Sequence, residues 1–393
     1  MVVIKCSDNG FVAVICEKIL RVYDLRKAVL VYKFSFPTKE LKAATKAESK
    51  DEESQLLNTT YTYGCAFSNS GKLFATFSDS KDLVVLRTED WQQIGKRKVP
   101  KRPTAVLFTN KEDGIVLSDK AGDVYSYKIS EDTGLSNESV LLGHVSIILD
   151  MAISRDDRYI VTADRDEKIR VSCFPNSYNI ESFCLGHTEY VWKIIIPDKI
   201  PQVLVSASGD GTLRFWDYKV GKTVHMETFK NVQSEKTKKV VSCLTSSRTE
   251  NIVFVGLEGS LSLYAFRIKE KTMTVEQISI VDLTLDGPPC CLAVDCNNQL
   301  WVVQSYKEQP LLVFEMSEEA GSYKFKRQSS WSFLTAEDLD FIYEGTRKRP
   351  SSINLKRNKE DFGTSDYFNR KKDRIEAKRK KDELETQAKK MKT

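Results

Sequence analysis

The cysteines and histidines are the side chains best suited to metal chemistry, but the sequence scatters them. It contains nine cysteines and three histidines in 393 residues. The densest group is Cys290, Cys291 and Cys296, without a Cys-x-x-Cys pair or a histidine near it in the sequence. A structural zinc takes four such ligands, so the sequence predicts no metal site. The cysteines lie in apolar runs of a chain without an export signal, and we interpret them as buried free thiols.

Patterns typical of catalysis or cofactor binding are also missing. Neither Gly-x-Gly-x-x-Gly nor Gly-x-x-x-x-Gly-Lys-Ser/Thr, the loops that cradle phosphates, occurs in the sequence. Acid-base and nucleophilic chemistry needs titratable groups within reach of one another. His144 and His187 instead recur together with carboxylates such as Asp164 and Asp166 in a repeated unit. The sequence therefore predicts a protein that is not an enzyme and that holds no cofactor in this chain.

The repeated unit is clearest where the letters LGH at 185–187 are followed by SGDGTLRFWD at 208–217. This is a WD repeat, which predicts a four-stranded blade with Asp210 bonding back toward His187 and Trp216 packed between sheets. The best second copy begins at His144. Its histidine-to-aspartate spacing of 22, to Asp166, agrees with the 23 between His187 and Asp210.

Counterparts of Trp216 recur along the first 330 residues, and five of the seven positions are aromatic. The markers are Tyr23, Leu86, Tyr127, Ser172, Trp216, Tyr264 and Phe314, at intervals of 63, 41, 45, 44, 48 and 50. Intervals near 40 to 45 residues are typical of one propeller blade. The sequence therefore predicts an all-β fold, a seven-bladed WD-repeat β-propeller over residues 1–330. The long first interval is explained by residues 37–57, which are polar and charged and are predicted to form an insertion loop.

The end of the propeller is followed by a short helix. We expect residues 323–328 to form the last outer strand, with residues 2–6 lapping back as the alternative. Thr335 and the acidic residues that follow it have the pattern of an N-cap and first helical turn. The sequence predicts a short helix within 331–345 that docks on the propeller.

The C-terminal residues 346–393 are strongly basic. They hold 17 Lys and Arg against 8 Asp and Glu, a net charge of +9, whereas residues 1–345 carry −4. Few large apolar residues follow Leu355, which predicts a flexible tail able to form a helix on a partner. Such a tail attracts RNA phosphate, serves as a nuclear import signal, or is only a solubilising terminus. We expect a nuclear protein, with the cytoplasm as a second location, and neither a signal peptide nor a membrane span.

The letters ADRDEKIRVS at 163–172 and IESFCLGHTE at 180–189 resemble the WD-repeat non-catalytic subunit of the tRNA (guanine-N7) methyltransferase. Supporting matches are LLGHV at 141–145, SGDGTLR at 208–214, KRKVPKRP at 96–103 and DYF at 366–368. The resemblance implies a propeller that binds and stabilises a separate catalytic subunit as a heterodimer. That complex would form N7-methylguanosine in the tRNA variable loop. S-adenosylmethionine would bind to the catalytic partner.

The resemblance also implies which residues face the methyltransferase. They are Arg165, Glu167, Lys168 and Arg170. Arg170 occupies the same repeat position as Arg21 and Arg214. A structural role within the propeller and a contact with the partner are therefore equal alternatives for Arg170. Lys168 is the sharper candidate because Thr212 occupies its register in the next repeat and the fold requires no cation there.

Basic residues in two segments are candidates for binding RNA. They are Lys96, Lys98, Lys101 and Arg102 in the run at 96–103, and Lys371 and Lys372 in the tail. Side chains alternate along a strand, so at most about half of the run would face one ligand. A solvated outer strand is an equal alternative.

Two other functions are compatible with a propeller. One is a general scaffold, such as a ubiquitin-ligase substrate receptor or a chromatin adaptor, which binding to one methyltransferase would distinguish. The other is an enzyme with chemistry in the central channel, for which the sequence offers no convergent group of catalytic side chains.

Overall fold

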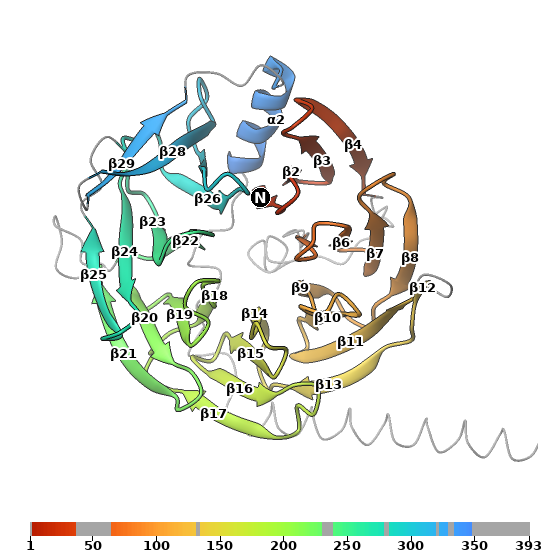
Figure 1. Cartoon of the computed structure of the whole chain (residues 1–393). Coiled ribbons are helices and arrows are strands. Elements are labelled where there is room, and N and C mark those ends of the chain that lie inside the picture. The colour runs from red at the N-terminus through yellow and green to blue at the C-terminus, as the bar shows by residue number, and fades with distance from the viewer. Residues whose placement is uncertain are drawn as a thin grey trace, which may run out of the picture. The chain divides into compact units, whose positions relative to one another are not determined.

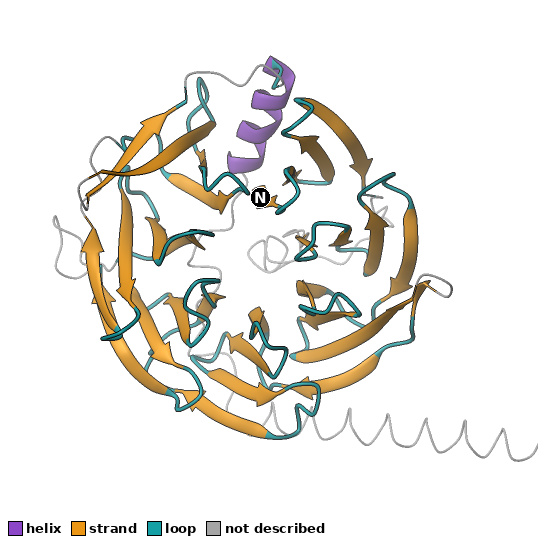
Figure 2. Cartoon of the chain, in the orientation of Figure 1, coloured by secondary structure: helices purple, strands orange, loops and turns teal. Residues whose placement is uncertain are grey.

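The computed structural model describes residues 2–36, 64–130, 134–229, 239–278, 283–319, 322–328 and 334–347. These residues form seven antiparallel sheets around a central axis (Figure 1). The predicted all-β, seven-bladed propeller is therefore confirmed. Figure 2 shows the strands as a ring, with the only helix of the described residues beside it. The predicted insertion loop at 37–57 and the tail after Arg347 lie outside the described residues.

The blades follow the chain in order. Blade 1 consists of β1 (Val2–Cys6), β2 (Phe11–Cys16), β3 (Ile19–Asp24) and β4 (Val29–Ser35). Blade 2 consists of β5 (Gly64–Phe67), β6 (Leu73–Phe77), β7 (Asp82–Arg87) and β8 (Gln93–Lys98). Blade 3 consists of β9 (Pro103–Phe108), β10 (Gly114–Asp119), β11 (Asp123–Ser130) and β13 (Ser139–Gly143), with the short β12 (Gly134–Leu135) paired to the end of β11.

The remaining four blades have the same layout. Blade 4 consists of β14 (Ile148–Ile153), β15 (Tyr159–Asp164), β16 (Ile169–Cys173) and β17 (Ile180–Cys184). Blade 5 consists of β18 (Val191–Ile195), β19 (Val203–Ser208), β20 (Thr212–Asp217) and β21 (Lys222–Thr228). Blade 6 consists of β22 (Val241–Ser246), β23 (Ile252–Leu257), β24 (Leu263–Lys269) and β25 (Thr274–Ile278). Blade 7 consists of β26 (Pro289–Val294), β27 (Leu300–Gln304), β28 (Leu311–Glu319) and β29 (Ser322–Arg327).

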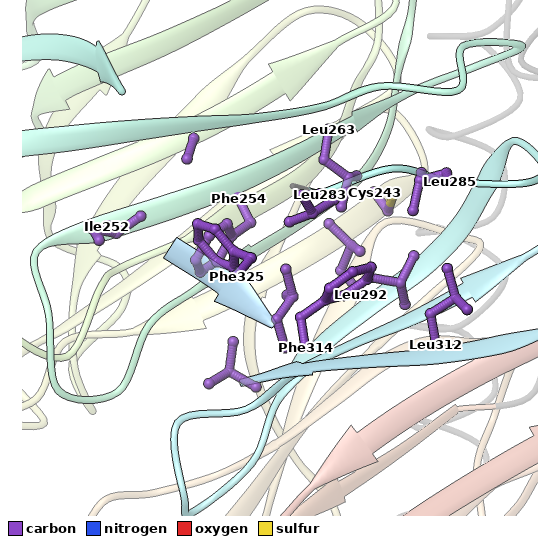
Figure 3. Packing of buried hydrophobic residues seen from close by; sticks show 14 of the residues in the cluster. Cys243, Ile252, Phe254, Leu263, Leu283, Leu285, Leu292, Leu312, Phe314 and Phe325 are labelled. Carbon is purple, nitrogen blue, oxygen red and sulfur yellow. The ribbon is translucent and has the colours of Figure 1, made fainter. Parts of the chain in front are cut away.

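The core lies between neighbouring blades. The second strand of a blade is covered by strands on both sides and by blades on both faces, so β2, β19 and β23 are buried at every residue. Figure 3 shows the cluster that blades 6 and 7 share, where Phe254 of β23 packs against Phe325 of β29. Because each face is buried only by the next blade, a single repeat would not be stable alone.

The sequence markers lie on the third strand of each blade, and six of the seven are in one register. Trp216 pairs with Leu204, the second residue of β19. In blade 6 the equivalent position is Phe266, which pairs with Val253 and is fully buried. The marker Tyr264 was therefore wrong by two residues. Side chains of a strand alternate with period two, so a shift of two residues keeps the same face and hides the error.

The ring closes between the first and last blades without exchange of a strand. β29 is the fourth strand of blade 7, as predicted for residues 323–328. The alternative, in which residues 2–6 lap back, is wrong because β1 is the innermost strand of its own blade and pairs with β2. Blades 1 and 7 instead share a core cluster that includes Val2 and Trp301.

Helix α2 (Ala336–Arg347) covers this junction and extends two residues beyond the predicted end (Figure 1). Its Ile342 is fully buried in the cluster of blades 1 and 7. Thr335 caps the helix as predicted, because its Oγ1 accepts the Asp338 N–H at 3.2 Å while Asp338 Oδ2 accepts the Thr335 N–H at 3.0 Å. No helix in the described ranges has both the length and the apolar character required to cross a membrane.

An ion pair anchors the helix to blade 1. The buried Arg21 guanidinium bonds to the buried Asp338 carboxylate and lies 2.6 Å from the exposed Glu337 carboxylate. The Tyr23 hydroxyl donates to Asp338 at 2.6 Å, and Phe341 packs against the guanidinium at 4.4 Å. Burial alone would raise the pKa of Asp338, but the hydrogen bonds from Tyr23, Thr335 and Arg21 outweigh it and hold that pKa below its ordinary value.

Candidate partner and nucleic-acid interface

One face of the ring carries both groups of predicted binding residues. In an antiparallel blade, the turn between the second and third strands lies at the same end as the loop to the next blade. We call this end the turn face. The turn between β15 and β16 holds Arg165, Glu167 and Lys168, and the loop between β8 and β9 holds Lys101 and Arg102. The partner and RNA candidates outside the tail therefore share, or adjoin, one face.

The WD signature of blade 5 forms the expected buried network. His187 Nδ1 lies 2.9 Å from Asp210 Oδ2, and its Nε2 lies 2.7 Å from Ser206 Oγ. Trp216 Nε1 donates to the same Ser206 oxygen at 2.8 Å. Burial lowers the pKa of His187, and the bond to Asp210 offsets this only in part. The histidine is thus a neutral structural group that holds the turn of blade 5.

Blade 4 uses a different aspartate from the one that the spacing predicted. His144 Nδ1 lies 2.9 Å from Asp164, at a separation of 20 residues, and the pairing with Asp166 is wrong. Asp164 is the last residue of β15, where blade 5 has Ser208, and its carboxylate reaches the His144 ring. The other Asp164 oxygen accepts the N–H groups of Asp166 and Lys168, each at 2.9 Å. Asp164 therefore fixes the turn that carries the predicted partner residues.

The side chains of this turn differ in their exposure to solvent. Glu167 and Lys168 are exposed at its tip, and Glu167 has the left-handed backbone (φ 73°) that Gly211 (φ 75°) has in blade 5. Arg165 is half-buried, and its Nε has no hydrogen-bond partner within the described residues. A buried guanidinium nitrogen without a partner is costly, which favours an incoming acceptor at this position.

Arg170 is bonded within the propeller. Its Nε donates to Ser172 Oγ at 2.9 Å, and one terminal nitrogen donates to the Ser177 carbonyl at 2.9 Å. Blade 5 has Trp216 where blade 4 has Ser172, and there Arg214 stacks over the indole ring at 5.7 Å. Arg170 thus makes structural contacts, which is one of the two roles that its register left open. Of the predicted partner residues, Glu167 and Lys168 are the two that are exposed.

Exposed apolar side chains lie in the loops before and after blade 4 and on the outer strands of blades 4 and 5, and no sequence pattern indicated them. Leu185, which is 62% exposed, precedes the Gly-His pair of blade 5, and the exposed Val145 follows His144. On the outer strands, exposed Phe183 pairs with Arg170, and exposed Met226 pairs with Arg214. Exposed apolar groups that gather on one surface are typical of an interaction site. In the sequence these exposed apolar residues look the same as the core residues of predicted strands. Only their exposure in the folded protein distinguishes them from core residues.

Several basic side chains of the run at 96–103 are already bonded within the propeller. Lys96 Nζ and Lys98 Nζ lie 3.5 Å and 3.0 Å from the same oxygen of Asp82. Arg97 points the other way and donates to the Leu135 and Ser136 carbonyls of blade 3. This is the alternation expected of a strand.

The loop that follows this strand holds the other two candidates. Arg102 Nε lies 2.6 Å from Asp79, and the exposed Lys101 makes no ion pair within the described residues. Lys371 and Lys372 lie in the part of the tail that the structure does not describe.

The described residues hold no arrangement typical of metal binding. They include no group of three or more His, Cys, Asp or Glu side chains placed to hold a metal ion. All nine cysteines are free thiols, five of them buried and four, including Cys290, Cys291 and Cys296, half-buried. Burial raises the pKa of Cys65 to about 12, so this thiol is not a nucleophile near neutral pH.

The fold and its His-Asp-Ser-Trp network define a seven-bladed WD-repeat propeller whose turn face offers cationic and apolar groups to a partner. Residues 24–139 and 130–332 match the family described as the tRNA methyltransferase TRM82 WD40 domain. The chain belongs to this family.

Named relatives agree with this assignment. The chain is 38% identical over 277 residues to the tRNA (guanine-N(7)-)-methyltransferase non-catalytic subunit WDR4 of Bos taurus, covering 68% of this chain and 65% of that protein. The subunit of the same name in Homo sapiens is 38% identical over 256 residues, covering 63% and 60%. The Danio rerio subunit is 36% identical over 324 residues, covering 80% and 78%. The chain thus spans somewhat less than two thirds of the bovine and human proteins.

Solved structures support the fold alone. A chain of the crystal structure of the mitotic checkpoint complex aligns with a TM-score of 0.61 at 12% identity, covering 77% of this chain and 87% of that one. The structure of U3-55K aligns with a TM-score of 0.59 at 14% identity, covering 77% and 89%.

Proposed function

We propose that this chain is the non-catalytic subunit of a tRNA (guanine-N7) methyltransferase. It binds and stabilises a separate catalytic subunit as a one-to-one heterodimer and supports N7-methylguanosine formation in the tRNA variable loop. Membership of the family is the observation that carries this proposal. The turn of blade 4 supports the proposal as a surface for a protein partner, because Lys168 and Glu167 are exposed there and the exposed apolar residues Leu185 and Val145 lie in the loops on either side of blade 4.

The proposed mechanism needs no catalytic side chain in this subunit. A partner that binds only the folded methyltransferase stabilises that fold by mass action. Lys168 and Arg165 would meet carboxylates of the catalytic subunit, Glu167 a cation, and Leu185 an apolar side chain. Charged contacts at the edge of an interface fix orientation, while the apolar contacts supply most of the affinity. S-adenosylmethionine is assigned to the catalytic partner, which carries out the methyl transfer.

A methyl-transfer assay on unmodified tRNA tests this function. It compares this chain alone, the catalytic subunit alone, and the two mixed in equal amounts. We expect substantial methylation only in the mixture. If the catalytic subunit alone reaches the rate of the mixture, this chain is not its auxiliary subunit, and a general scaffold function becomes the better interpretation.

Reversal of the charge at Lys168 is expected to weaken the heterodimer. The Lys168→Glu variant should raise the Kd for the catalytic subunit about tenfold, because an attractive contact becomes a repulsive one. The matched control is Lys271→Glu, an exposed lysine on the opposite face in blade 6. Calorimetric titration gives the Kd, and thermal unfolding checks the fold. An unchanged Kd would remove Lys168 from the interface.

An acidic residue at Leu185 should also oppose binding. We expect Leu185→Asp to raise the Kd about tenfold or more, since a carboxylate would be buried against an apolar surface without a partner. Leu261→Asp is the control, because Leu261 is 53% exposed on the same face in blade 6. Equal affinities of the two variants would place the interface elsewhere.

The basic tail is proposed to add electrostatic attraction for tRNA through Lys371, Lys372 and their neighbours, and to direct the protein to the nucleus. Deletion of residues 350–393 should leave the heterodimer intact but lower RNA affinity and make its salt dependence shallower. Filter binding over a range of salt concentrations measures both. RNA binding that is unaffected by the deletion at every salt concentration would leave the tail only a targeting role.

A further inference from the structure

A single exposed lysine lies on the inner edge of the ring. The first strand of each blade is its innermost strand (Figure 1). On these seven strands as the structure describes them, Lys5 of β1 is the only exposed residue. Lys5 also makes no ion pair with the described residues. A cation is therefore open to solvent near the axis of the ring.

The propeller does not require a cation at this position. Lys5 pairs with Ala13, the residue that follows the partner of the marker Tyr23. The equivalent positions of blades 2 to 7 hold uncharged side chains, and five of the six are apolar: Ala66, Leu107, Ala152, Ile195, Thr245 and Ala293. An ammonium group in such a layer costs free energy. Because six blades fold without it, a ligand explains Lys5 better than the fold does.

Lys193 of β18 supplies a second cation close to the first. It lies two residues from Ile195, the equivalent of Lys5, and so on the same strand face. Lys193 Nζ lies 2.8 Å from Asp150 Oδ2 of β14, which also accepts the Ile194 N–H at 3.0 Å. The charge of Lys193, and then burial, lower the pKa of Lys5, while Asp150 opposes them only in part. Because blades 6 and 7 separate blade 5 from blade 1, the two ammonium groups face each other across the axis.

The groups that act on Lys5 leave a net positive charge. Lys5 and Lys193 contribute two positive charges, whereas Asp150 contributes one negative charge and is already bonded to Lys193. The thiols of Cys65 and Cys291 also lie near Lys5. Burial raises the pKa of Cys65 to about 12, so this thiol is neutral near pH 7 and does not balance the lysines. An anion placed between the two ammonium groups would relieve their repulsion.

We propose that Lys5 and Lys193 bind a small free phosphate compound, such as pyrophosphate, at the axis of the ring. Ammonium groups act as point charges toward phosphate oxygens. A compound with two phosphates offers an oxygen to each lysine, which a chloride ion does not. The bound anion would connect blade 1 to blade 5 across the ring and so stabilise the closed propeller. This site goes beyond the proposed function and does not depend on a catalytic partner.

The test is calorimetric titration of pyrophosphate into the full-length chain, in phosphate-free buffer held at constant ionic strength with KCl. We expect one site per chain. Lys5→Met should raise the Kd about tenfold or more, because it removes one of the two cations. The matched control is Lys33→Met, which removes an exposed lysine from β4, the outermost strand of the same blade. Its Kd should equal that of the wild type. Equal Kd values for the two variants would overturn the proposal.

Thermal unfolding gives a second readout, compared within each variant with and without the anion. Pyrophosphate at ten times its Kd should raise the Tm of the wild-type chain by about 2 °C, because it binds only the folded ring. Lys33→Met should show the same increase and Lys5→Met none. Lys5→Arg should keep the increase, because it keeps the charge. An equal increase in Lys5→Met would contradict the site.

Chemical acetylation tests the site without any substitution. Pyrophosphate at ten times its Kd should slow the acetylation of Lys5 about tenfold, because the free site is then about one tenth of the total. Acetylation of Lys33 should be unchanged. Mass spectrometry of the digested chain measures both rates. Equal rates at Lys5 with and without pyrophosphate would place the anion elsewhere and overturn the proposal.

Two further measurements separate this site from the proposed function. If Lys5→Met weakens the binding of unmodified tRNA as strongly as that of pyrophosphate, Lys5 belongs to an RNA contact and the proposal is overturned. Heterodimer formation is measured without anion, by light scattering of the mixed subunits. If no heterodimer forms while pyrophosphate binding still depends on Lys5, the methyltransferase role fails and the anion site stands.

Discussion

Replacement of Asp338 by alanine is expected to lower the free energy of unfolding by about 3–5 kcal/mol, because it leaves the buried Arg21 charge without its partner. Asp338 bonds to the Arg21 guanidinium and to the Tyr23 hydroxyl, and it caps its own helix through Thr335. These contacts connect α2 to blade 1 at the only junction where the ring is not closed by a continuous chain. Chemical denaturation, followed by tryptophan fluorescence, measures the loss.

Glu337→Ala is the matched control for this prediction. Glu337 contacts the same guanidinium at 2.6 Å, but its side chain is 76% exposed. Solvent-exposed ion pairs are worth at most about 1 kcal/mol, so this variant should be nearly as stable as the wild type. The double variant Arg21→Met/Asp338→Leu should recover much of the lost stability by replacing the buried pair with apolar contacts. A loss below about 1 kcal/mol for Asp338→Ala would show that the helix does not secure the ring.

The second large effect is expected at the turn of blade 5. Asp210→Ala should destabilise the propeller by about 3 kcal/mol or more, because it leaves several buried donors unsatisfied. Asp210 is bonded to His187 Nδ1 and accepts the N–H groups of Thr188 and Thr212. Asp217→Ala in the same blade is the control, since Asp217 is half-buried and its side chain accepts only a 3.4 Å bond from Val220 among the described residues. Equal unfolding midpoints for the two variants would contradict this role.

The same network predicts how stability depends on pH. Burial lowers the pKa of His187 below its ordinary 6.5, so the unfolded chain binds this proton at a higher pH than the folded chain. The contribution of His187 to the free energy of unfolding is therefore complete above about pH 6.5, and it decreases as the pH falls below that value. Burial raises the pKa of Asp210, but the hydrogen bonds from His187 and Thr212 lower it by more, so that it lies below its ordinary value. The contribution of Asp210 to the free energy of unfolding is therefore lost only at a lower pH. We expect Tm to fall between about pH 7 and pH 5, and to fall less in a His187→Gln variant. A flat profile would contradict this.

The departures from the repeat coincide with the proposed function. Equivalent positions on the outer strands hold Lys33 and Lys96 in blades 1 and 2, but Phe183 and Met226 in blades 4 and 5. A repeat that only had to fold would not need this difference, because all four positions pair with the third strand in the same way. Lys33 is exposed, whereas Lys96 lies 3.5 Å from Asp82. Blades 4 and 5 present exposed apolar groups at these positions instead. The exposed apolar pair agrees with the protein partner that is proposed to bind beside the turn of blade 4.

Much of the architecture follows from the sequence alone. The number of blades, the last outer strand and the capped helix depend on patterns that repeat along the chain or lie within a few residues. The Thr335 cap is local, and the blade signature recurs with a period near one blade, so each is visible without knowledge of the fold.

Other features depend on contacts between distant residues, which no local pattern encodes. Tyr264 and Phe266 share a strand face, so only strand pairing shows that Phe266 is the equivalent of Trp216. The similar spacing indicated Asp166 as the partner of His144, yet His144 bonds to Asp164. The two blades hold their turns with carboxylates at different register positions.

Long-range packing likewise decided which charges are available to a partner. Arg21 meets Asp338 across 317 residues of sequence. Asp82 pairs with the ammonium groups of Lys96 and Lys98, and Asp79 pairs with the guanidinium of Arg102. A charged side chain binds a partner only where the fold has not already neutralised it, and that balance depends on neighbours brought together by the closed ring.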